Sequence, residues 1–182
     1  MITKTNKIME NTPSIATLHH LLDYDASKFT NAEIRLKTSL AEWLLKADSV
    51  KLKLVLQKYL DFVDQHVKKM EKFFEDEQMS SLSLNNPVMQ GLIEDADEKL
   101  SFCTDAEVKD ACILAFIQVI NHYKISIYGT ATAYANMLEL DKAAVVFHEA
   151  EINEKQIDDR LSQLAEYEIN RKAKAPIKID QV

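Results

Sequence analysis

The chain has 182 residues, of which 47% are apolar and 28% are charged, and its formal net charge is −7. This composition fits one globular domain with a substantial core. The acidic balance argues against a nucleic-acid partner, because binding to phosphates depends on clustered Lys and Arg. Two Gly and three Pro are too few for the turns of a sandwich, a barrel or a Rossmann fold, so the composition predicts an all-α protein.

No apolar run approaches the roughly 18 residues of a membrane span, and the first residues lack the apolar stretch of a signal peptide. We therefore expect no membrane partner and a cytoplasmic location. Cys103 and Cys112 belong to no CxxC pair and have no cluster of metal ligands around them. Both thiols are expected to be reduced, as is usual in a reducing compartment.

The two ends of the chain differ from its middle. Residues 1–11 are polar and uncapped, so we expect them to be disordered. Thr12 before Pro13 predicts an N-cap with Pro at the first helical position, and residues 12–170 form the predicted helical domain. Residues 171–182 are basic and contain a Pro, and we expect them to form a flexible tail.

Apolar residues that recur every three or four positions predict two long helices in the first half. The first contains Ala26 and ends near Asp48 or Ser49, and the second runs to about Glu77. The connection between them is only a few residues long, which predicts an antiparallel pair.

The second half begins with a shorter helix. Asn86 before Pro87 predicts its N-cap, and it ends near Leu100. The segment 104–107, Thr-Asp-Ala-Glu, has the spacing of a capping box and opens a long helix that reaches Leu138.

A final helix starts near Asp141 after a short turn, which predicts a second antiparallel pair. The segment that joins the two pairs is long enough to cross the length of a bundle. Two hairpins joined by one long crossover form a ferritin-like antiparallel four-helix bundle, here with a short extra helix in the crossover.

Charges interrupt the apolar seams of three helices, at Glu33, Lys124 and Glu154. An α-helix rises by about 1.5 Å per residue. By this measure the polar residues of each hairpin lie at about the same distance from the tight turn along the helix axis. Aligned hairpins would therefore form one buried polar layer, with these members: Glu33, Tyr59, His66, Asn121, Lys124 and Glu154.

An isolated charge in a dry core is costly, so this layer must be paired, hydrated or bound to metal. A ferritin-like di-iron site uses a Glu from each of two helices and a Glu-x-x-His motif from each of the other two. The chain has no Glu-x-x-His, and the nearest pattern is the reversed His148-x-x-Glu151. We predict that Lys124 occupies the place of the metal, paired with Glu33 and Glu154. The alternative is that Lys124 extends to the rim and both acids are hydrated.

Four segments, in order, carry a resemblance to a known family. NHYKISIYGT at 121–130 is similar to the E-H-Y-E-I-x-x-Y-G-T helix of the YciF/YciE-type family of ferritin-like bacterial stress proteins. AEIRL at 32–36, MQGLIEDADE at 89–98 and NEKQIDDRLSQLAE at 153–166 resemble further segments of that family. The resemblance implies a ferritin-like bundle, usually a homodimer, with a di-metal site and a role in stress.

The resemblance also implies which ligand positions are kept. Glu33 and Glu154 match family ligands, whereas Asn121 and Lys124 stand where the family has Glu, and Tyr59 stands where it has His. These departures favour an altered metal site.

The favoured interpretation is a non-catalytic ferritin-like protein with a degenerate di-metal site, acting as a homodimer in a stress response. It requires no cofactor, no catalytic residue and no small-molecule substrate. A different possibility is an interaction or storage-shell module that forms large assemblies. The enzymatic alternative is a di-iron protein with oxidase or peroxide-scavenging chemistry, with a His and these carboxylates as iron ligands: Glu33, Glu94, Glu151, Glu154 and Asp158.

Overall fold

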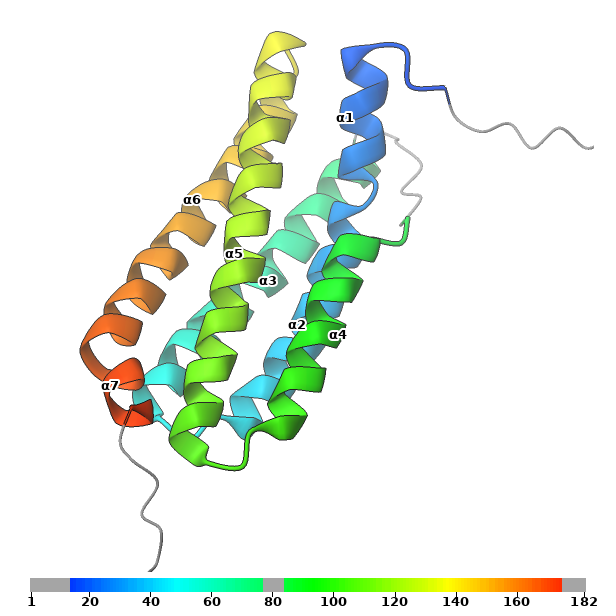
Figure 1. Ribbon diagram of the computed structural model, residues 1–182. Helices are drawn as coiled ribbons and strands as arrows, with labels where there is room; N and C mark the ends of the chain where they lie inside the picture. The colour runs from blue at the N-terminus through cyan, green and yellow to red at the C-terminus, as the bar shows by residue number, and fades with distance from the viewer. Residues whose placement is uncertain (1–13, 77–83, 175–182) are drawn as a thin grey trace, which may run out of the picture.

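The computed structural model describes residues 14–76 and 84–174, and every regular element in these ranges is helical. The prediction of an all-α protein is confirmed. The long helices lie side by side, roughly along one axis (Figure 1). The elements are α1 (Leu18–Ala26), α2 (Phe29–Lys46), α3 (Val50–Asp76), α4 (Pro87–Phe102), α5 (Ala106–Met137), α6 (Asp141–Leu164), the π-helix Ala165–Ile169 and α7 (Asn170–Ala173).

Two short turns, residues 47–49 and 138–140, connect consecutive long helices. They allow α2 to pack along α3 and α5 to pack along α6 as antiparallel pairs. Across the pairs α3 contacts α6, and α4, which lies in the connection from α3 to α5, contacts α5 and α2. The extra helix expected in the crossover is therefore present. Residues 77–83 of the polar segment before it lie outside the described residues.

The start of the first long helix differs from the prediction. Thr12 and Pro13 lie outside the described residues, and the first described helix begins at Leu18, where the Thr17 hydroxyl accepts a hydrogen bond from the backbone N–H of His20. Ala26 ends this helix rather than belonging to the first long one. At the other end, helix continues through α7 to residue 173, beyond the predicted boundary at residue 170.

One predicted helix cap is confirmed and another is wrong. The Asn86 side chain caps α4, as predicted. The cap of α5 is Asp105 and not Thr104, because the Asp105 carboxylate accepts the backbone N–H of Val108 at 2.9 Å. Glu107 then stands at the second helical position, where the reciprocal bond of a capping box is not made.

A buried carboxylate from α5 holds the turn between α2 and α3. Asp110 accepts hydrogen bonds from the backbone N–H groups of Asp48, at 2.8 Å, and Ser49, at 2.7 Å. These groups precede the first turn of α3, where backbone N–H groups lack partners within the helix. The turn falls where the sequence predicts it, and the Ser49 hydroxyl caps α3 locally by accepting the backbone N–H of Leu52 at 3.4 Å. The contacts with Asp110 come from a distant part of the chain.

The core consists of two apolar clusters that follow one another along the helices. On α5, Ile120 belongs to one cluster and Tyr128 to the other, and on α6 Ile157 and Ala150 are divided in the same way. Asn121, Lys124 and Glu154 of the predicted layer fall between these positions. The layer therefore crosses the interior at the boundary between two apolar regions.

By length and composition α5 could cross a membrane, a test that the core helix of a globular protein also passes. In the structure it packs against α1, α4 and α6. It also buries Asp110, Asn121 and Lys124 along its length, which interrupt its apolar runs. Its place in the core accounts for its composition.

Candidate functional site

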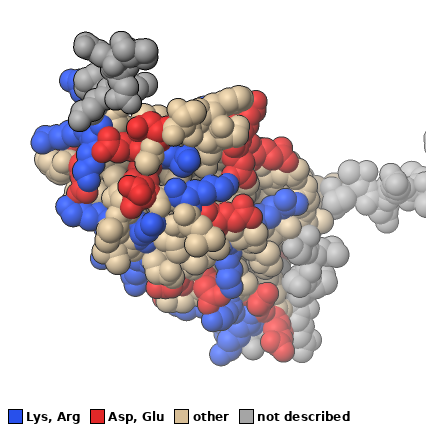
Figure 2. Space-filling view, turned by 90° about the horizontal axis from the view of Figure 1, so that it is seen from below, with Lys and Arg blue, Asp and Glu red and all other residues tan. Residues whose placement is uncertain are grey.

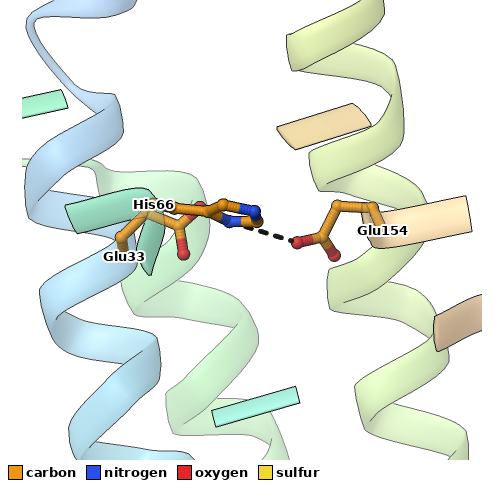
Figure 3. A group of neighbouring side chains, drawn as sticks. All are labelled: Glu33, His66 and Glu154. Atoms are coloured by element: carbon orange, nitrogen blue, oxygen red, sulfur yellow. Dashed lines mark hydrogen bonds and ion pairs between the residues drawn. The ribbon is translucent and has the colours of Figure 1, made fainter. Parts of the chain in front are cut away.

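The structure brings the six residues of the predicted polar layer together from the four long helices. Each is buried, with exposed fractions of 0–2%. Glu33 comes from α2 and Glu154 from α6, and His66 of α3 lies between them (Figure 3). Tyr59 also comes from α3, and α5 contributes Asn121 and Lys124.

Lys124 lies at the centre of the layer and does not extend to the rim. Its Nζ is 2.9 Å from Oε2 of Glu33 and 2.5 Å from Oε1 of Glu154, and the side chain is 1% exposed. Both contacts are buried ion pairs between the ammonium and a carboxylate. The same Nζ lies 4.9 Å from the centre of the Tyr59 ring, close enough for a cation–π contact.

Glu154 receives two further donors. The Tyr59 hydroxyl donates to its Oε2 at 2.7 Å, and the Asn121 amide donates to the same oxygen at 2.6 Å. The Asn121 amide also reaches the backbone carbonyl of Glu154, at 3.0 Å. These contacts fix the carboxylate in one orientation, with its other oxygen toward Lys124.

Glu33 is held by Tyr128 and His66. The Tyr128 hydroxyl donates to its Oε1, and Nδ1 of His66 lies 3.3 Å from the same atom. Nδ1 is also 3.7 Å from Glu154. A nitrogen that faces two carboxylates is suited to carry a proton, which leaves Nε2 to accept from the Asn153 amide at 3.2 Å.

Tyr128 and Asn153 are not among the predicted members of the layer. Tyr128 is 1% exposed and stands four positions after Lys124, one helical turn away on α5. Asn153 directly precedes Glu154. The spacing from Lys124 could have indicated Tyr128, whereas the contact of Asn153 with His66 depends on how α3 and α6 are rotated against one another.

The pKa values of these groups follow from burial and from their neighbours. Burial opposes ionisation of Glu33, but Lys124 and His66 outweigh it and lower the pKa to about 2. Burial raises the pKa of Glu154, an effect that Lys124 opposes and the Glu33 charge reinforces. Burial also opposes the charge on Lys124, yet the two carboxylates raise its pKa above the ordinary value. The ammonium and the Glu33 carboxylate are therefore both charged at neutral pH.

Glu33, His66 and Glu154 are a candidate ligand set for a metal ion. Each offers one ligand atom, and these atoms lie within 4.8 Å of one another. Carboxylates and imidazole suit iron and zinc. The Lys124 ammonium contacts two of the three groups, so a metal ion among them would meet a positive charge at short range. With Lys124 in this place the residues do not fit a centre of two divalent cations.

The other carboxylates of the alternative iron site do not lie in this group. Glu94 is exposed on α4. Glu151 pairs with Lys155 at 2.6 Å, and Asp158 with Nε2 of His122 at 2.8 Å. Glu151 and Asp158 stand three and four positions from Glu154, on the same side of α6. Their side chains are partly exposed, however, and pair with exposed residues at the edge of the core.

The His148–Glu151 pair and the two cysteines lie outside the polar layer. Nδ1 of His148 lies 3.4 Å from Oε2 of Glu151, and the His148 side chain is 60% exposed, so this pair is at the surface. Cys103 and Cys112 are free thiols. Burial and the neighbouring Cys103 thiol raise the pKa of Cys112 to about 11, which favours an unreactive thiol.

Comparison with known proteins finds relatives that are similar in sequence and in structure. Protein YciF of Escherichia coli K12 is 29% identical over 161 residues, which cover 88% of this chain and 97% of YciF. The crystal structure of YciF, described as an E. coli stress protein, matches with a TM-score of 0.79 and 28% identity over 88% of this chain and all of the other. The structure of YcfI from Rhodopseudomonas palustris has the same TM-score, with 26% identity over 83% of this chain and 96% of that one.

Fold and sequence together define a YciF-like all-helical protein. The family model described as "Domain of unknown function (DUF892)" matches residues 17–174. The chain belongs to this DUF892 family, as the resemblance to YciF-type proteins predicted.

Proposed function

We propose that this protein is a non-catalytic member of the ferritin-like four-helix bundles whose di-metal site is degenerate. In this proposal Lys124 stands in place of the metal. The observation that carries it is the fully buried ammonium in contact with both Glu33 and Glu154. One lysine then supplies the positive charge that these two acids require in a dry interior.

The donor set supports the same proposal. Two of the positions that match family ligands in the sequence, Glu33 and Glu154, are present and buried. Asn121 and Tyr59 act instead as hydrogen-bond donors to Glu154. A carboxylate that receives two such donors and an ion pair has most of its lone pairs engaged, and few remain for a metal ion.

The competing function is a metal-binding protein with oxidase or peroxide-scavenging chemistry. It is favoured by one observation, the approach of three ligand groups to within 4.8 Å. Metal binding there would require Lys124 to leave both carboxylates or to lose its proton. Its raised pKa opposes the second route.

A role outside catalysis places the function on the surface of the protein. We propose a cytoplasmic homodimer with a role in stress, in line with the description of YciF as a stress protein. The proposal includes no nucleic-acid partner, no membrane and no cofactor. Light scattering coupled to size-exclusion chromatography separates a dimer from the large assemblies of a storage shell.

Metal analysis tests the central claim. The protein is purified from cells grown in iron-supplemented medium, without chelators, and its metal content is measured per chain by inductively coupled plasma mass spectrometry. We expect well under one metal ion per chain. Stoichiometric iron, together with the near-ultraviolet absorption of an oxo-bridged di-iron centre, would overturn the proposal in favour of the alternative.

A further inference from the structure

A pocket of about 260 Å³ is lined by residues of α1, the start of α2, the beginning of α4 and the second half of α5. None of the six residues of the predicted polar layer lines it. Leu22, Phe29 and Ala131 contribute a buried apolar wall. This volume is somewhat below the range of about 300–1,000 Å³ that is typical of drug-sized ligands, so it suits a molecule of about a dozen non-hydrogen atoms.

One side of the pocket carries a row of hydroxyl groups from α5. Ser126, Thr130 and Tyr134 are spaced by four residues, which places them on one face of the helix. Within the described residues, none of these three hydroxyls has a hydrogen-bond partner. Three uncommitted donors on one wall can bind an anionic or carbonyl oxygen.

The junction of α1 and α2 adds one charge of each sign. Asp25 and Lys28 both line the pocket, and the described residues include no ion pair that joins them. The Lys28 ammonium rests over the ring of Tyr24, 3.9 Å from its centre. Burial raises the pKa of Asp25, and Lys28 opposes this effect, so the carboxylate lies in a partly dry setting.

We propose that this pocket binds a small zwitterion with an apolar side chain, such as an aromatic α-amino acid. Its ammonium group pairs with Asp25, and its carboxylate with Lys28 and the α5 hydroxyls. Its side chain packs on Phe29 and Ala131. A ligand with only one charge would engage Asp25 or Lys28 and leave the other without a partner, so both charges of the ligand contribute to affinity.

L-phenylalanine is the probe for the first experiment, with the full chain at neutral pH and binding followed by ¹⁵N–¹H NMR. We expect saturable shifts of backbone signals on α1 and α5 around the pocket, with a Kd of about 0.1–1 mM for a ligand of this size. Phenylacetate lacks the amine and phenethylamine lacks the carboxylate. Each is expected to bind about tenfold more weakly than L-phenylalanine.

Three variants separate the pocket from the rest of the surface. Asp25→Asn and Lys28→Gln should each weaken the binding of L-phenylalanine about tenfold. Asp25→Asn should leave the affinity for phenylacetate nearly unchanged, because this probe has no amine. Lys28→Gln should do the same for phenethylamine, which has no carboxylate. Thr130→Phe should abolish binding, because it fills the mouth of the pocket from an exposed position. Ala133→Phe is the matched control, since residue 133 is exposed on the same helix and does not line the pocket.

Circular dichroism of every variant shows whether it is folded, and a variant that is not folded is replaced by Thr130→Leu or Asp25→Ser. The proposal is overturned if L-phenylalanine causes no saturable shift at about 20 mM, far above the expected Kd. It is also overturned if all three probes bind equally to wild type and to the charge variants, because the pocket would then be a nonspecific apolar hollow. Saturable binding that Thr130→Phe removes and Ala133→Phe keeps supports it.

Discussion

Lys124 on α5 and Glu33 on α2 form an ion pair of 2.9 Å inside the protein, between two apolar clusters. A buried ion pair is not in itself a strong source of stability, because both charges lose their hydration. It does make each member depend on the other, since removing one leaves an uncompensated charge in a dry place. The layer therefore responds differently to single and to combined substitutions.

Lys124→Met should lower the free energy of unfolding by about 3–5 kcal/mol at neutral pH. It leaves the carboxylates of Glu33 and Glu154 facing one another without a cation. Urea unfolding followed by circular dichroism measures the change. Lys155→Met is the control, because Lys155 pairs with Glu151 at the exposed surface of α6, where a loss below about 1 kcal/mol is expected.

The combined variant Glu33→Gln/Lys124→Met/Glu154→Gln should recover most of that loss, because no unpaired charge remains in the core. A Lys124→Met protein as stable as the wild type would contradict a central role for this charge. So would a triple variant that is less stable than the single one.

Alkaline pH should destabilise the protein through the layer. Burial and the neighbouring carboxylates raise the pKa values of Tyr59 and Tyr128 well above 10, and those carboxylates raise the pKa of Lys124 against the effect of burial. In the unfolded chain these groups lose their protons near pH 10, whereas in the folded protein they keep them. Stability is therefore full below about pH 10 and falls as pH rises, by up to about 1.4 kcal/mol per pH unit for each group.

Urea unfolding at a series of pH values from about 9 to 12 measures this slope. Tyr59→Phe removes one titrating group, so its slope should be shallower than that of the wild type. Tyr24→Phe is a suitable control, since Tyr24 lies outside the layer. Equal slopes in the wild type and in Tyr59→Phe would contradict the prediction.

Removing the ammonium should create a metal site. In Lys124→Ala the candidate ligands are Glu33, His66 and Glu154, which already lie close together. Co²⁺ should then bind at micromolar concentrations, with visible absorption bands that the wild type lacks at the same concentration. The control adds His66→Ala, which removes the imidazole and should weaken binding at least about tenfold. Absence of Co²⁺ binding to folded Lys124→Ala would show that the three groups cannot act as a ligand set.

The two helical glycines should respond differently to alanine. A Cβ at Gly91 meets nothing within 4 Å, so Gly91→Ala should stabilise the protein by about 0.8–1 kcal/mol, the full difference in helix propensity. A Cβ at Gly129 would lie 3.2 Å from Oε1 of Glu151, which Lys155 holds at 2.6 Å. Gly129→Ala should therefore stabilise the protein by less than Gly91→Ala does.

Thermal unfolding measures the effect of both substitutions, because a stability change of 1 kcal/mol shifts the melting temperature of a chain of this size by about 2–4 °C. In a Glu151→Ala background the obstacle at Gly129 is absent, and the two alanine substitutions should become similar. A larger gain at Gly129 than at Gly91 in the wild-type background would contradict the prediction.

Much of this fold could be predicted from local sequence. Scarce Gly and Pro together with apolar spacings of three and four predicted helices, and Asn86 before Pro87 predicted a cap that the structure contains. The same spacing predicted that Glu33, Lys124 and Glu154 face the interior. These predictions succeed because helix formation, capping and the face of a residue depend on neighbours within one or two turns.

Other features depend on distant parts of the chain. Asp110 accepts the backbone N–H groups of the turn at Asp48 and Ser49. On α5, Tyr128 is buried and reaches Glu33, whereas the adjacent Ile127 is only partly buried. Successive residues on a helix differ by about 100° in direction, so a small rotation of one helix against another decides which of two neighbours points inward.

The sequence by itself thus determined the helices and the buried charges. Which of these charges contact one another, and where a pocket remains at the junction of α1 and α2, was decided by the tertiary structure. The reason is physical: local patterns set the face that each helix buries, whereas the distance between side chains on different helices depends on rotation, height and close packing across the whole core.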